Sequence, residues 1–96
     1  MINMAVRGDS GAVIARARCG LPWTNELGGL DPAAFPMLTA LLPYADAVFN
    51  ERQIPVLLKE LDRLPDEVGG DWVEETRELC AIALQAPHRY LWFLGD

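Results

Sequence analysis

Carboxylates are the reactive groups that this sequence concentrates most strongly. Residues 60–78 hold eight acidic side chains against Arg63 and Arg77. Carboxylates can act as acid–base pairs, bind metal ions or attract cations. So many pairs exist here that no spacing selects a glycosidase-like pair, and no Asp-x-Asp loop indicates a metal site. Attraction of a basic partner remains, and we predict a partner-binding site made of Glu67, Asp71, Glu74, Glu75 and Glu78.

Four of these acids form two pairs that stand one helical turn apart, Asp71 with Glu75 and Glu74 with Glu78. Like charges at this spacing destabilise a helix by about 0.2–0.5 kcal/mol per pair. Acids in the first turn are partly compensated, because they complement the helix dipole. A solvated helix face with good N-terminal capping is therefore the alternative interpretation, and the sequence leaves both open.

The other residues with catalytic potential form no recognisable constellation. His88 is the only histidine, and Ser10, the only serine, falls in a predicted turn, so no catalytic triad is indicated. Cys19 and Cys80 are too isolated for a zinc site or a disulfide framework, and we expect two buried free thiols. We therefore predict that the protein is not an enzyme and has no catalytic residues, no cofactor and no metal.

Net charge limits the classes of partner. The chain has a formal charge of −6, whereas nucleic acids and anionic membranes attract basic surfaces, so we expect neither of these partners. No signal peptide is recognisable, and no window approaches the roughly 20 apolar residues that span a bilayer. We expect a cytoplasmic protein.

The residue patterns at both ends of the chain predict strands. Ninety-six residues, about half of them apolar, suit a single domain over residues 1–96. The apolar run at residues 90–94 would be costly in water, so we predict a final strand covered on both faces. Alternation in residues 2–19 around the turn at 8–11 predicts a hairpin, with an Ala-rich helix over 12–19 as the alternative. Residues 20–36 predict a packed loop, and periodicity does not decide the state of residues 37–42.

Two amphipathic helices are predicted before the final strand. The first begins at Asn50, where Gln53 completes a capping box, and ends before Pro65. The second begins at Asp71, where Glu74 completes the same pattern. Its apolar face consists of Trp72, Val73, Thr76, Leu79, Cys80 and Ala83, widened by Ile82 and Leu84. The predicted fold is α+β: a small antiparallel sheet, formed by the N-terminal hairpin and the C-terminal strand, packed against two helices.

One segment resembles a known group of proteins. Residues 43–53 match the pattern Pro-Tyr-x-Asp-x-Val-Phe-Asn-x-x-Gln, and the chain ends in an aromatic segment, Leu91–Asp96. Both are similar to features of small uncharacterised bacterial proteins, and the similarity runs from Leu41 onward. The resemblance implies a stand-alone bacterial domain of the kind encoded near toxins or regulators, and it implies no activity.

These observations lead to three functional hypotheses. The first is a non-catalytic binding module of the inhibitor or immunity type, which neutralises a basic protein such as a nuclease toxin through its acidic face. The second is a homo-oligomeric accessory or regulatory protein that self-associates through its aromatic strand. The third is a small-molecule binder or an enzyme that uses a pocket lined by Trp23, Trp72 and Tyr90.

Overall fold

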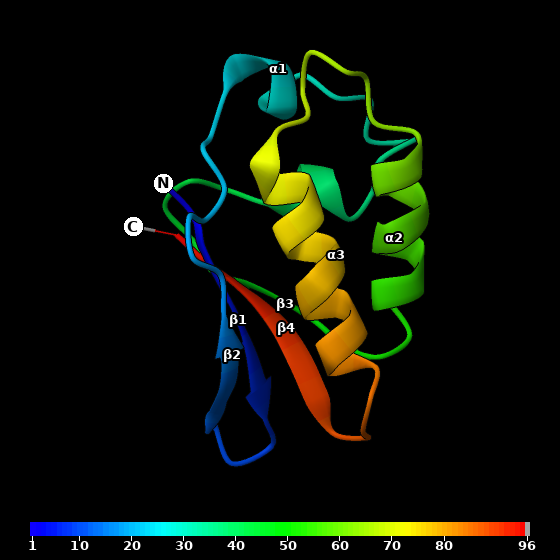
Figure 1. The fold of residues 1–96 in the computed structure, drawn as a ribbon. Helices are drawn as coiled ribbons and strands as arrows, with labels where there is room; N and C mark the ends of the chain where they lie inside the picture. Colours follow the sequence, from blue (N-terminus) through cyan, green and yellow to red (C-terminus); the bar gives the residue numbers. More distant parts are fainter. Residues whose placement is uncertain (96) are drawn as a thin grey trace.

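The computed structural model describes residues 1–95. Within them, four strands form one antiparallel sheet in the order β2-β1-β4-β3, and two main helices pack on one face (Figure 1). This arrangement confirms the predicted α+β fold. The strands are β1 (Asn3–Gly8), β2 (Val13–Arg16), β3 (Ala47–Phe49) and β4 (Arg89–Leu94). The helices are α1 (Asn25–Gly28), the 3-10 turn η1 (Leu38–Ala40), α2 (Ile54–Asp62) and α3 (Asp71–Ala83).

β1 and β2 form the predicted N-terminal hairpin. Ala5 pairs with Arg16 and Val6 with Ala15, so the alternative of a helix through this segment is wrong. Gly11 closes the turn by donating its amide hydrogen to the Gly8 carbonyl at 3.0 Å. Its φ of +84° lies in the left-handed region, which glycine adopts without steric cost.

β4 lies at the centre of the sheet, between β1 and β3, as a buried apolar strand should. Leu91 and Phe93 point toward the helices and are buried, whereas Tyr90 and Trp92 on the opposite face are half-buried. No helix in residues 1–95 covers that opposite face (Figure 1). The prediction that both faces of the final strand are covered is therefore wrong within a single copy of the chain, which leaves a second copy as the other possible cover. Residues 20–42 do not cover it either, because their apolar side chains join the core on the helix side.

β3 extends the sheet beyond the hairpin and the final strand. Val48 pairs with Trp92 and Phe49 with Leu91. The Phe49 ring meets the edge of the Phe93 ring at 5.6 Å between centroids, which fixes β3 against the core. Three residues are too few to show strand alternation in the sequence, and this strand was not predicted.

Apolar side chains from the sheet and the helices meet in one core. Met4 and Val6 of β1 belong to this core together with Leu57 and Leu61 of α2, and Met4 accepts a hydrogen bond from Thr76 of α3 at its sulfur. The predicted apolar face of α3 is largely confirmed, since Trp72, Thr76, Leu79, Cys80 and Ala83 are buried. Leu84 is 44% exposed at the end of α3, so the prediction that it widens this face is wrong. No helix within residues 1–95 has the length and apolarity needed to cross a membrane.

Both helix starts differ from the prediction. The Asn50–Gln53 box forms: the Asn50 side chain accepts from the Gln53 amide at 3.0 Å, and the Gln53 side chain accepts from the Asn50 amide at 2.9 Å. Regular helix nevertheless begins only at Ile54, after this turn and with Pro55 in the first helical turn. In α3, Gly70 is the N-cap and makes no side-chain bond. Asp71 is the first helical residue, so the predicted Asp71–Glu74 box is wrong.

Candidate functional site

The acidic residues predicted as one surface occupy three different environments. Asp71, Glu74 and Glu78 line a single groove of about 360 Å³ beside α3, together with Arg18 and Cys19. Their spacing of three and four residues places them on one side of the helix, which the sequence predicted. Glu67 is exposed in the turn that precedes α3 and does not line this groove.

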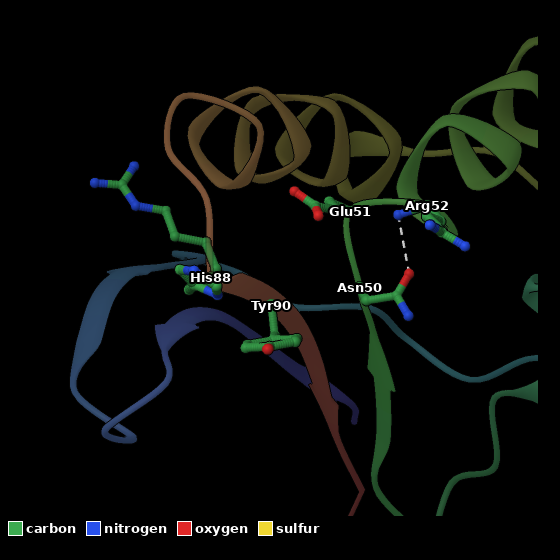
Figure 2. A pocket seen from close by; sticks show the side chains of 6 residues that line it. Asn50, Glu51, Arg52, His88 and Tyr90 are labelled. Atoms are coloured by element: carbon green, nitrogen blue, oxygen red, sulfur yellow. Dashed lines mark hydrogen bonds between the residues drawn. The ribbon is translucent and has the colours of Figure 1, made fainter.

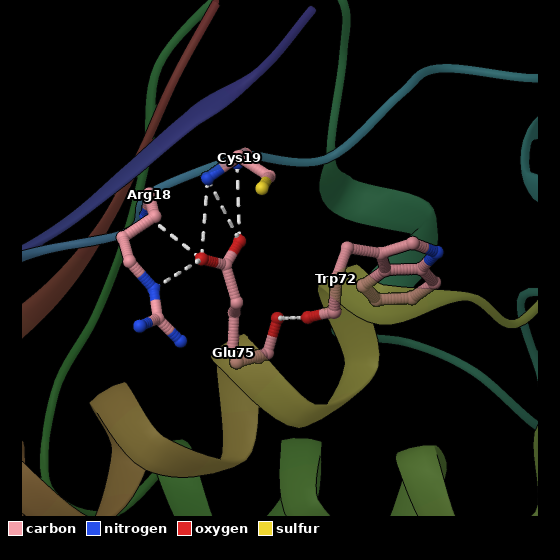
Figure 3. A network of polar contacts seen from close by, with 6 residues as sticks. Arg18, Cys19, Trp72 and Glu75 are labelled. Carbon is pink, nitrogen blue, oxygen red and sulfur yellow. Dashed lines mark hydrogen bonds and ion pairs between the residues drawn. The ribbon is translucent and has the colours of Figure 1, made fainter.

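Glu75 lines the same groove but is turned into the protein. Its residue is only 8% exposed, and its carboxylate accepts hydrogen bonds from the backbone amides of Arg18 at 2.7 Å, Cys19 at 3.2 Å and Gly20 at 3.1 Å (Figure 3). Three successive amides that converge in this way form an anion nest, and the φ of +79° at Gly20 helps to close it. Glu75 thus holds the segment after β2 against α3 and is no part of the exposed acidic surface.

The environment of Glu75 favours its charged form. Burial by itself raises the pKa of this carboxyl, but the three amide hydrogen bonds and the nearby Arg18 guanidinium outweigh burial and leave the pKa below its ordinary value of 4.5. The Arg18 Nε lies 4.0 Å from the carboxylate. Glu75 therefore fills the nest as an anion at neutral pH.

Glu60 is a second internal carboxylate that the sequence reasoning grouped with the exposed acids. It is fully buried on α2 and accepts from the amides of Met37 at 3.0 Å and Leu38 at 3.0 Å. These amides open η1 and have no partner within that turn, so Glu60 serves as its cap. Glu60 lies between Lys59 and Leu61 and completes no capping pattern with its own helix, so no local signal in the sequence indicates this contact.

The three groove carboxylates differ from Asp62 and Glu75 because none of them is ion-paired, although Arg18 lines the same groove. Asp62 is paired with Arg77 at 2.7 Å, which links α2 to α3. Among residues 1–95, no ion pair joins Asp71, Glu74 or Glu78 to a basic side chain. We name Asp71, Glu74 and Glu78 the acidic face of α3. It is the one part of the predicted site whose members lie together and remain free to meet a partner.

The two cysteines have opposite environments. Cys80 is buried in α3, and burial raises the pKa of its thiol to about 12 despite the charge of Arg77. Cys19 is exposed at the edge of the groove, so the prediction of two buried thiols holds only for Cys80. The segment around Cys19 is held at the surface by Glu75, a contact 56 residues away in sequence.

His88 lies beside a second, polar pocket of about 230 Å³, formed where the turn before α2 meets the start of β4 (Figure 2). His88 leads into β4 as predicted, and it adopts a φ of +62°. Its Nδ1 lies 3.4 Å from the Asp9 carboxylate. Hydrogen bonding to Asp9 and the negative charge of that residue raise the pKa of the Tyr90 phenol.

The hypothesis of a pocket lined by Trp23, Trp72 and Tyr90 is wrong. Trp72 is buried in the core, whereas Tyr90 lies on the sheet face that points away from the helices and lines the polar pocket. Within residues 1–95, no three His, Cys, Asp or Glu side chains cluster in a way that could hold a metal ion.

Comparisons of the chain with protein families, with curated proteins and with solved structures gave no match. The resemblance of residues 43–53 to small bacterial proteins therefore stays a prediction.

Proposed function

We propose that this protein is a non-catalytic binding module that holds a basic protein partner on the acidic face of α3, as an inhibitor or immunity protein would. The proposal rests on the different environments of the acidic side chains in residues 60–78. Glu60 and Glu75 are satisfied internally and Asp62 is paired, whereas Asp71, Glu74 and Glu78 line one groove, and none of the three is ion-paired within residues 1–95.

Keeping three like charges on one helix face has an energetic cost. The dipole of α3 compensates Asp71 and Glu74 in the first turn, but it does not reach Glu78 two turns into the helix. A lysine or arginine of a partner would remove this repulsion and place its aliphatic stem along the groove. The same charges would accelerate the encounter with a basic protein, an effect that salt weakens.

The mechanism would be occlusion: a basic active site covered by this face could no longer reach a phosphate backbone. We also propose that the protein is cytoplasmic, because this mechanism requires it to meet the toxin inside the cell.

The test is an affinity capture from the source organism with the whole protein as bait. The first variant carries Asp71→Lys, Glu74→Lys and Glu78→Lys. A matched control carries Glu26→Lys, Glu51→Lys and Asp66→Lys, which gives the same net charge from exposed acids outside the acidic face. We expect the wild type and the control to capture a basic protein that salt releases, and the first variant to lose it. Equal loss in both variants would show a general effect of net charge and contradict the proposal.

Self-assembly is the second candidate function, and the uncovered sheet face favours it. Tyr90 and Trp92 are half-buried there, and Val48 beside Trp92 is exposed. A homo-oligomeric accessory protein would bury these residues in an interface.

A further inference from the structure

The uncovered face of the sheet carries arginines around a tryptophan. The register places Ala5, Arg16, Val48 and Trp92 in one row across all four strands, and Arg7 follows on β1. The Arg7 guanidinium lies over the Trp92 ring, 4.7 Å from its centroid. We name these five residues the sheet platform.

The platform is positively charged, although the chain as a whole is acidic. The strand positions that share this face hold no acidic residue; they are Asn3, Ala5, Arg7, Val13, Arg16, Val48, Tyr90, Trp92 and Leu94. Within residues 1–95, neither Arg7 nor Arg16 forms an ion pair or a side-chain hydrogen bond. The Arg7 Nε is buried and lacks an acceptor, which is an unfavourable state for a guanidinium nitrogen. Both arginines of the platform are thus without a carboxylate partner within the described residues.

We infer that the acidic face of α3 of one copy packs on the sheet platform of a second copy, head to tail. The inference rests on self-assembly, the second function proposed above, and it names a second copy of this chain as the occupant of the acidic face. The two surfaces are of opposite sign, none of their charged side chains is ion-paired within residues 1–95, and guanidinium forks match carboxylates in geometry. Symmetric packing of platform on platform would instead oppose arginine to arginine with no carboxylate between them.

Whether the net charge of −6 prevents this contact depends on the distance over which charges interact in solution. At physiological ionic strength, charges are screened beyond about 8 Å. Ion pairs at contact distance persist under these conditions, whereas repulsion across a molecule with dimensions of 34 × 25 × 20 Å is largely screened. At about 1 M salt the screening length falls to about 3 Å, and the pairs themselves weaken. Association should therefore be present at physiological salt and lost at high salt. Head-to-tail contacts form rings or open chains rather than symmetric dimers.

Sedimentation velocity of the full chain tests the inference with two variants, Arg16→Glu on the platform and Glu74→Arg/Glu78→Arg on α3. Both variants alter exposed side chains, and circular dichroism of each variant would check that it folds as the wild type does. We expect wild-type assemblies at physiological salt and a monomer for each variant alone. An equimolar mixture should assemble again, because each variant supplies the surface that the other lacks.

Three results would overturn the inference: a monomeric wild type at its highest soluble concentration, variants that assemble as the wild type does, or a mixture that stays monomeric. Binding of a fluorescent oligo-dT by a monomeric wild type would also overturn it, since the platform would then serve a nucleic acid. A monomeric wild type whose α3 variant still loses a captured basic protein would refute the inference and leave the proposed function standing. If the α3 variant lost neither self-assembly nor the captured basic protein, both the inference and the proposed function would be refuted.

Discussion

Replacement of Glu60 should destabilise the protein more than replacement of any exposed acid. The carboxylate is fully buried and accepts from two backbone amides, those of Met37 and Leu38. Hydrogen bonds to a charged group contribute about 1.5–3 kcal/mol each, and a buried amide left without an acceptor costs about 1–3 kcal/mol. Glu60→Ala leaves both amides without an acceptor and opens a cavity. We expect a loss of about 3–5 kcal/mol in the free energy of unfolding, a large part of the 5–15 kcal/mol typical of a domain.

Two further substitutions separate the loss of the hydrogen-bond acceptor from the loss of side-chain volume and from the removal of an acid in general. Glu60→Gln keeps the shape but offers one acceptor oxygen and turns an amide donor toward the donors of η1, so we expect an intermediate loss of about 1–3 kcal/mol. Glu67→Ala removes an exposed acid without a described partner and should change the free energy of unfolding by less than about 0.5 kcal/mol.

Urea unfolding followed by tryptophan fluorescence measures all three, because Trp72 leaves the core on unfolding. If the unfolding free energy depends equally steeply on urea concentration in all variants, the differences between their unfolding midpoints report differences in stability. If Glu60→Ala unfolded at the same urea concentration as Glu67→Ala, the amides of residues 37 and 38 would not depend on this carboxylate. The reasoning about η1 would then be refuted.

The remaining predictions concern Glu75 and the thiols. Because the folded-state pKa of Glu75 is lowered, its stabilising effect is present above the unfolded-state pKa and is lost as the pH falls through the folded-state value. The difference in unfolding free energy between the wild type and Glu75→Gln should therefore shrink on acidification in urea titrations, and parallel pH profiles would contradict this. Iodoacetamide should modify only Cys19 in the folded protein and Cys80 as well in urea, as measured by mass spectrometry; rapid modification of Cys80 in the folded state would show that its helix opens.

Local patterns predicted much of the fold because they depend on neighbours in the chain. The apolar spacing of α3, the turn between β1 and β2 and the capping box at Asn50 each involve residues a few positions apart. The alignment of Glu74 with Glu78 on one side of a helix is equally local. These features follow from backbone geometry whatever the rest of the chain does.

The uncovered sheet face and β3 could not be predicted in this way. Whether Trp92 is covered depends on which side of the sheet both helices choose, and that choice is made by the whole core. β3 gains its identity only from pairing with β4, more than forty residues later. The exposure of Cys19 likewise depends on the course of a loop that α3 fixes.

Composition and periodicity are local properties of the chain, and they suffice to predict an acidic α+β protein with amphipathic helices and a buried final strand. The role of each acid depends instead on contacts that form only in the folded protein. Glu60 and Glu75 are identical in type to Glu74 and Glu78, but backbone amides from distant segments meet only the first two. A carboxylate becomes internal when folding brings unpaired donors to it, and it stays a surface charge when folding does not.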